Sequence, residues 1–138
     1  VLAFMAREGW KMANVVGQPV RYLGFVDDAD LAVLYRLATS LVYPSLFEGF
    51  GFPPLEAMQS GLPVVVSRVS SLPEVVGQAG LYVNPTEVIS IRRGLTKILT
   101  DRGLRRTLAE AGRRQAKQFT WEKTVKETVA LYRELLYP

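Results

Sequence analysis

The sequence predicts an α/β fold, a parallel sheet with helices on both faces, followed by further helices at the C-terminal end. Through residues 1–85 short apolar runs alternate with short helical patterns. Such alternation with short loops is typical of right-handed β-α-β units, which build parallel sheets. After Pro85 the apolar residues recur only at helical spacing, so the rest of the chain is expected to be helical.

Four apolar runs are predicted to be the strands of this sheet, at residues 20–26, 41–43, 64–66 and 81–83. The run at 64–66 consists of valine alone, as is typical of parallel strands that are buried on both faces. This pattern favours a doubly wound, Rossmann-like sheet. In such sheets ligands bind beyond the carboxyl ends of the strands, where loop 45–52 is expected to lie.

The helices are predicted from apolar spacing and from residues suited to helix ends. Three are expected between the strands: one that begins at aspartates 27–30, one over about 54–60 after two prolines, and one short turn at 71–74. Three more follow: one to about Thr100 with Val88 on its buried face, one capped by Asp101 and one capped by Thr120. Trp121, at the start of the last helix, is expected to pack in the core.

The composition excludes several kinds of chemistry. The 138 residues contain no histidine and no cysteine. This excludes Ser-His-Asp and Cys-His nucleophiles, zinc sites built on those residues, and disulfides. Catalysis would have to use carboxylates, lysine, arginine, hydroxyls or the backbone. The lack of cysteine is compatible with a cytoplasmic location, and no apolar run approaches the length of a membrane span.

The net charge of +4 is distributed unevenly. Residues 1–85 carry a balance of −2, and residues 86–138 carry +6. The basic run lies between residues 92 and 117, and a solvated outer helix face is favoured over a binding surface. Contact with anionic lipid at the inner membrane face stays open as a secondary hypothesis. No nucleic-acid partner is expected, because no aromatic residue for base stacking lies between Tyr82 and Phe119.

The most informative segment runs from Phe47 to Glu56. Glu48 and Glu56 flank seven residues that include two glycines, two prolines and the predicted helix start. Glycines let a backbone approach a ligand closely, and a helix start suits phosphate. Two carboxylates, which can accept sugar hydroxyls, beside such an anion cradle point to a phosphorylated sugar. From the residues alone the alternative stays open that Glu56 only complements the helix dipole in the first turn and that the glycines form an ordinary loop.

Residues 44–58 closely resemble the signature of retaining, nucleotide-sugar-dependent glycosyltransferases of family 4, which have the GT-B architecture. Residues 61–65, 71–75, 80–85 and 119–121 fit the same family in order and spacing. The resemblance implies that residues 1–138 are a single donor-binding domain, the C-terminal half of an enzyme whose N-terminal acceptor domain is absent here. The enzyme would transfer a glycosyl unit from a nucleoside-diphosphate sugar to a hydroxyl acceptor. The alternatives are a sugar-nucleotide epimerase and a non-catalytic sugar-nucleotide-binding module.

The resemblance also implies roles for single residues. Glu48 would be catalytic, near the donor sugar and its reacting carbon, and Glu56 would accept hydrogen bonds from the ribose. The remaining donor contacts would come from Gly49, Phe50, Gly51, Phe52 and Leu55, with Phe25 and Val26 at the edge of the base. No cofactor and no metal would be required. Asp28 and Asp30 imitate an Asp-x-Asp metal motif, but their place before a helix favours capping.

Two expectations concern partners. No segment matches the family's diphosphate-binding arginine and lysine, and Arg7 and Lys11 are not confident substitutes. The isolated chain is therefore expected to bind donor weakly or not at all, and to transfer no sugar. In the family the terminal helix crosses to the N-terminal domain, so Tyr132, Leu136 and Tyr137 are expected to be exposed, or to contact a neighbouring copy in a crystal or homo-oligomer.

Overall fold

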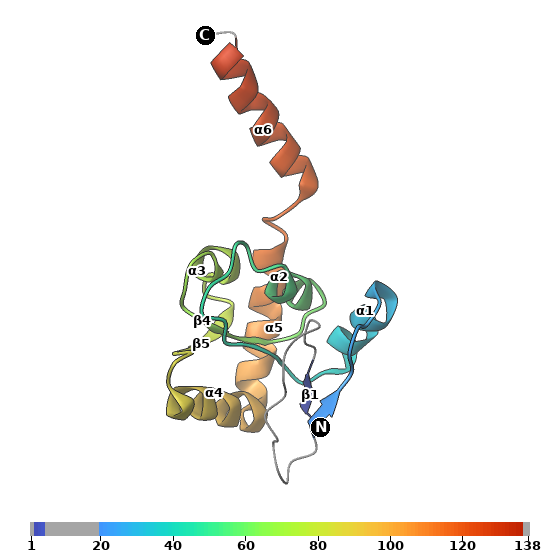
Figure 1. Cartoon of the computed structure of the whole chain (residues 1–138), viewed down its shortest axis with the longest axis vertical. Helices are drawn as coiled ribbons and strands as arrows, with labels where there is room; N and C mark the ends of the chain where they lie inside the picture. The colour runs from blue at the N-terminus through green and yellow to red at the C-terminus, as the bar shows by residue number, and fades with distance from the viewer. Residues whose placement is uncertain (1, 5–19, 137–138) are drawn as a thin grey trace. The chain divides into compact units, whose positions relative to one another are not determined.

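The computed structural model describes residues 2–4 and 20–136 of the chain (Figure 1). The chain divides into two compact units, Val1–Leu34 and Tyr35–Pro138. Each unit is described by itself below.

The first unit contains two short parallel strands, β1 (Leu2–Phe4) and β2 (Val20–Tyr22), with Leu2 paired to Val20. β2 is shorter than the predicted strand over 20–26, because Gly24 takes a positive φ of 66° and turns the chain. Helix α1 (Asp28–Leu37) begins in this unit. The Asp27 carboxylate accepts a hydrogen bond of 2.9 Å from the Asp30 amide, which confirms Asp27 as the N-cap. Asp28 and Asp30 lie within the first turn of α1 rather than before it, so the prediction that they cap the helix is wrong.

The second unit contains a parallel sheet of β3 (Leu41–Tyr43), β4 (Val64–Ser67) and β5 (Gly80–Val83), in that order. Helix α2 (Phe52–Gln59) joins β3 to β4, and α3 (Leu72–Val76) joins β4 to β5 (Figure 1). These are the strands and crossovers that the alternating pattern predicts, so the α/β fold is confirmed. Every loop that follows a strand emerges at the same edge of the sheet.

The central strand β4 is buried on both faces. On one face Val65 and Val83 form a core cluster with Ile98 and Leu108, which belong to α4 (Val88–Thr100) and α5 (Arg102–Ala116). On the other face, a Cβ added to Gly80 would lie 2.5 Å from Val76 of α3 and within 3.4 Å of the other two β4 valines. Helices therefore cover both faces of the sheet, as predicted.

Helix α4 contacts the sheet through its middle and C-terminal turns. A Cβ on Gly94 would lie 2.5 Å from the Val83 side chain, so only glycine permits this close approach. Val88 is 80% exposed, and its predicted burial is wrong. The reason is that Val88 lies in the first turn, outside the region that packs on Val65 and Val83.

The junction of α4 and α5 shows how Asp101 and Arg105 join two helices. Asp101 caps α5 as predicted and accepts a hydrogen bond of 2.8 Å from the Leu104 amide. The Arg105 guanidinium donates to the carbonyl oxygens of Ile98 and Leu99, at 2.6 and 2.8 Å, near the C-terminal end of α4. Arg105 therefore has a structural role that its predicted place on a solvated face does not include. The other basic residues of α4 and α5 are exposed.

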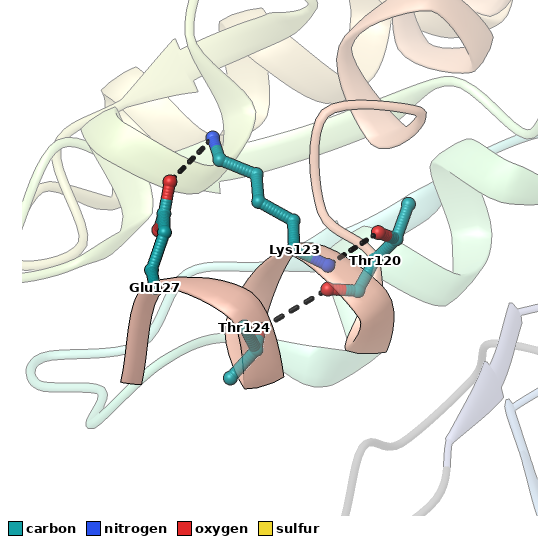
Figure 2. Close-up of polar contacts among 4 residues, drawn as sticks. All are labelled: Thr120, Lys123, Thr124 and Glu127. Carbon is teal, nitrogen blue, oxygen red and sulfur yellow. Dashed lines mark hydrogen bonds and ion pairs between the residues drawn. The ribbon is translucent and has the colours of Figure 1, made fainter. Parts of the chain in front are cut away.

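Helix α6 (Trp121–Leu136) is held by local contacts at its start (Figure 2). The Lys123 amide donates to the Thr120 hydroxyl at 3.1 Å, which confirms the predicted cap, and the Thr124 hydroxyl donates to the Thr120 carbonyl oxygen at 3.1 Å. The Lys123 ammonium lies 3.9 Å from the Glu127 carboxylate. Among the described helices, none combines the length and apolar character that a membrane span needs.

No side chain of α6 is buried among the described residues. Trp121 is 74% exposed, so the prediction that it packs in the core is wrong, because no described element covers the helix on which it lies. Tyr132 and Leu136 are exposed as expected. Tyr137 lies outside the described residues.

Candidate functional site

Two loops meet at the carboxyl edge of the sheet. The first, residues 44–51, leaves β3 and leads into α2, and the second, residues 68–71, leaves β4 and leads into α3. Ser67, the last residue of β4, is fully buried and donates its hydroxyl to the Ser45 carbonyl oxygen. The first loop is therefore bonded to the end of the neighbouring strand.

Glu48, which the sequence places in the first loop, is held at three of its polar groups. Its carboxylate oxygen Oε1 accepts a hydrogen bond of 2.7 Å from the Ser45 hydroxyl. Its amide donates to the Ser70 hydroxyl oxygen at 2.9 Å. The Ser71 hydroxyl lies 3.1 Å from the Glu48 carbonyl oxygen and 2.8 Å from that of Phe50, and it shares its proton between them.

Sequence reasoning missed the serine residues that make these contacts. Ser67, Ser70 and Ser71 are more than twenty residues away from Glu48 or Ser45 along the chain. A usable signal was present, because the run Ser-Arg-Val-Ser-Ser begins at the last residue of the buried strand β4. Parallel strands bring such a run to the same edge as the glutamate loop.

The start of α2 differs from the prediction. The helix begins at Phe52 rather than near Pro54, and Gly51 before it has a positive φ of 103°. A Cβ on Gly51 would also lie 2.8 Å from the Leu72 side chain, so both conformation and space require glycine. Glu56 is consequently the fifth residue of the helix. The expectation that Glu56 lies in the first turn is wrong, which removes the basis for a purely dipole-complementing role.

Glu56 is held by a residue that the sequence did not single out. The Tyr35 hydroxyl donates to Glu56 Oε2 at 3.1 Å, and Tyr35 is only 7% exposed. Burial, and then the Glu56 charge, raise the pKa of Tyr35 far above its ordinary value of 10.0. The hydroxyl therefore stays protonated and available as a donor. Tyr35 and Glu56 lie 21 residues apart, so no local pattern relates them.

The backbone between the two glutamates carries a run of amides without partners. The amides of Gly49, Phe50, Gly51 and Phe52 donate to none of the residues that the structure describes. Nothing lies within 4 Å of a Cβ placed on Gly49, so this part of the loop is open. The two prolines that follow have no N–H. The available donors therefore lie mainly in the loop rather than at the helix start, where the sequence also placed them.

Aromatic rings surround this loop. The Phe50 ring lies 4.8 Å from the Phe52 ring and meets the Phe119 ring edge-on at 6.0 Å, between ring centroids. Leu55, which was predicted to lie near the nucleoside, is 6% exposed and belongs to the core. Phe25 is 95% exposed in the first unit, and a role for Phe25 and Val26 at the base stays a prediction. Within the described residues, no group of three acidic, histidine or cysteine side chains could hold a metal ion.

Comparisons with known proteins identify the family of the chain. A family model described as "Glycosyl transferases group 1" matches residues 13–115. The O-antigen chain mannosyltransferase B of Escherichia coli is 47% identical over 94% of this chain, which spans 32% of that protein. The MMP α-(1→4)-mannosyltransferase of Mycolicibacterium hassiacum is 39% identical over 80% of the chain and 28% of the relative.

A solved structure agrees as well. The sucrose-phosphate synthase of Thermosynechococcus elongatus superposes with a TM-score of 0.77 at 36% identity, over 85% of this chain and 30% of that one. The chain thus spans about a third of the length of these relatives. Because the family model covers most of the chain, this chain belongs to the group 1 family of glycosyl transferases.

Proposed function

We propose that this chain is the donor-binding domain of a retaining glycosyltransferase. The observation that carries the proposal is the site itself, in which Glu48 lies in the loop, Glu56 lies in α2, and the chain between them carries four amides without a described partner. The loop lies at the carboxyl edge of a parallel sheet, where such folds bind ligands. The reaction would transfer a glycosyl unit from a nucleoside-diphosphate sugar to a hydroxyl acceptor.

The chemistry of the site supports a division of tasks. Glu48 would accept hydroxyls of the donor sugar near the reacting carbon, and Glu56 would accept hydroxyls of the ribose. The free amides of Gly49 to Phe52 would bind the sugar and the diphosphate. Donors placed in advance at a leaving diphosphate stabilise the charge that develops there, which is a large contribution to catalysis.

A hexosyl donor, and mannosyl in particular, is the substrate class that we favour. The relatives that are 47% and 39% identical to this chain are both named mannosyltransferases. The test is a panel of GDP- and UDP-linked mannose and glucose offered to the full protein, with the anomeric configuration of the product determined by NMR. Retention of configuration is expected, and an inverted product would contradict the proposal.

We further propose that transfer needs no metal or other cofactor, because backbone amides can bind the diphosphate directly. Activity is expected to survive dialysis against EDTA. Loss of turnover in EDTA, restored by Mg²⁺ or Mn²⁺, would refute this part of the proposal.

A sugar-nucleotide epimerase or a silent binding module is not favoured, because the relatives carry the names of transferases. Glu48→Ala in the full protein should lower kcat/KM for transfer by about a hundredfold or more, the scale for loss of a group at the reacting centre. Glu110→Ala, at an exposed position of α5, is the matched control and should change kcat/KM less than about twofold. If Glu48→Ala leaves turnover intact, the catalytic assignment fails.

Two partner proposals complete this function. First, the exposed apolar residues of α6 would contact the acceptor domain of the same protein, or a second copy.

Second, Arg92, Arg93 and Lys97 line a hollow of about 470 Å³ on α4 beside exposed Ile89, and would contact anionic lipid on the cytoplasmic side of a membrane. Sedimentation with phosphatidylglycerol vesicles, lost when the three cations are changed to glutamine, tests the second proposal. Retention by duplex DNA instead would contradict it.

A further inference from the structure

The two glutamates of the site share one arrangement that neither the family nor the sequence pattern indicates. In each, one carboxylate oxygen accepts a hydrogen bond from a neutral hydroxyl earlier in the chain: Ser45 of the same loop for Glu48, and Tyr35 of α1 for Glu56. The second oxygen, Glu48 Oε2 or Glu56 Oε1, has no hydrogen bond to the described residues. We propose that Tyr35 and Ser45 are positioning residues that orient these carboxylates for ligand hydroxyls, an inference that rests on the proposed function.

Tyr35 is suited to orient Glu56 because it cannot easily move. Its side chain is among the buried core residues, whereas Glu56 is half-buried on the adjacent helix. The hydroxyl reaches Glu56 Oε2 at 3.1 Å. A hydrogen bond to a charged acceptor fixes one rotamer of a side chain that would otherwise sample several. Oε1 is then presented with both lone-pair directions free for hydroxyl donors.

Ser45 holds Glu48 in the same way from the start of the loop, two residues after β3. Its hydroxyl donates to Glu48 Oε1 at 2.7 Å. Its own carbonyl oxygen accepts the hydroxyl of buried Ser67, so the donor is itself fixed to the sheet. Glu48 Oε2 is left for a ligand.

The two positioning residues should act on different parts of one ligand. Tyr35 acts through Glu56, which the proposed function places at the ribose. Ser45 acts through Glu48, which the proposed function places at the transferred sugar. Loss of Tyr35 should therefore weaken binding of any nucleotide that has ribose hydroxyls, and loss of Ser45 should impair only the handling of the sugar.

The first test uses Tyr35→Phe in the full protein, which removes one oxygen and keeps the ring. Calorimetry is carried out with GDP and UDP and with their 2′,3′-dideoxy forms. Affinity for the ribonucleotide that binds should fall about tenfold, as for loss of one hydrogen bond to a charged group. Affinity for its dideoxy form should stay within about twofold, because that ligand has no hydroxyl for Glu56. Thr107→Val, which removes an exposed hydroxyl of α5, is the control and should change neither affinity.

Two further measurements keep the Tyr35 test decisive. In a Glu56→Gln background Tyr35→Phe should add little, since Tyr35 acts through that carboxylate. Site-specific replacement of Tyr35 by 3-fluorotyrosine retains the hydroxyl and should restore ribonucleotide affinity, which a purely spatial role for the ring would not explain. If Tyr35→Phe does not fold, failure of the fluorinated variant to bind ribonucleotide better than dideoxynucleotide overturns the inference.

The second test uses Ser45→Ala. Nucleoside-diphosphate affinity should stay within about twofold, whereas kcat/KM for the nucleotide sugar should fall about tenfold. The inference is overturned if Tyr35→Phe lowers affinity for the ribonucleotide and the dideoxynucleotide equally. It is also overturned if Ser45→Ala lowers nucleotide affinity as much as it lowers kcat/KM. Either result would show a merely structural role. If the unaltered protein binds no nucleotide at all, the proposed function itself fails, which is a distinguishable result.

Discussion

The glutamate loop and helix α6 are stabilised in opposite ways. The loop over residues 44–51 is bonded to residues 22 to 23 positions away in the chain, through serine hydroxyls at a buried strand end. The described polar contacts of α6 all join residues within four positions of each other, and none of its side chains is buried. The loop is thus shaped by the second unit itself, whereas α6 has only local contacts and its apolar face has no described partner.

The largest effect on stability is expected at the end of the loop. Gly51→Ala forces a side chain into a positive-φ conformation and against Leu72, and should cost about 2–4 kcal/mol of the free energy of unfolding. Urea unfolding monitored by circular dichroism measures it. Gly49→Ala is the control, since a Cβ there meets nothing within 4 Å. Equal costs at the two glycines would refute the claim that the loop conformation depends on Gly51.

The serine contacts should contribute the next largest effect. Ser71→Ala removes the hydroxyl shared by two loop carbonyls and should cost about 1 kcal/mol. It should also speed hydrogen exchange of the Glu48 amide, which donates to the Ser70 hydroxyl, while exchange in α6 stays unchanged. Ser60→Ala, whose hydroxyl has no hydrogen bond among the described residues, provides the comparison. Unaltered exchange in the loop would show that the serines do not hold it.

A similar loss at α6 should remain local. Thr120→Ala removes the cap of α6 and should cost that helix about 1 kcal/mol. Because the side chains of α6 are not buried among the described residues, faster exchange should be confined to its first turns. A matching loss of stability in the sheet would mean that α6 packs on the rest of the unit.

The smallest effect concerns pH. The raised pKa of Tyr35 means that the folded chain holds this proton more tightly than the unfolded chain does. Stability from this group is therefore complete below pH 10 and declines as the pH rises above that value. Tyr35→Phe should make the free energy of unfolding less dependent on pH above 10. An unchanged pH dependence in the variant would contradict this assignment.

The fold could be predicted because its signals are local. Strand β4 is indicated by its own run of valines, and the caps at Asp101 and Thr120 bond to amides three positions along the chain. All three predictions are confirmed. The site was predicted at Glu48 and Glu56 by spacing and by family resemblance. The contacts of Tyr35 and Ser71 were missed, since they span 21 to 23 residues and arise only when the sheet forms. For Tyr35 no local pattern could have indicated the contact, whereas for Ser71 the serine run at the end of β4 was a usable signal.

Other expectations failed for physical reasons. Trp121 was expected inside because large aromatic residues usually are, but burial requires a covering surface that no described element supplies. The predicted start of α2 is two residues too late. Proline is typical of the first helical turn, and nothing in the sequence pattern indicated that Gly51, before Phe52, adopts a left-handed conformation.

The hydroxyls that hold the two glutamates have a consequence for ligand choice. Serine and tyrosine carry no formal charge here, and neither Glu48 nor Glu56 forms an ion pair with a described residue. Both negative charges therefore remain uncompensated within the described part of the chain. If the proposed function holds, we expect a bare anion such as pyrophosphate to be repelled by the two carboxylates. A ligand that carries hydroxyl groups beside its phosphates would offset that repulsion by donating to the carboxylates, and should bind more tightly than phosphate alone.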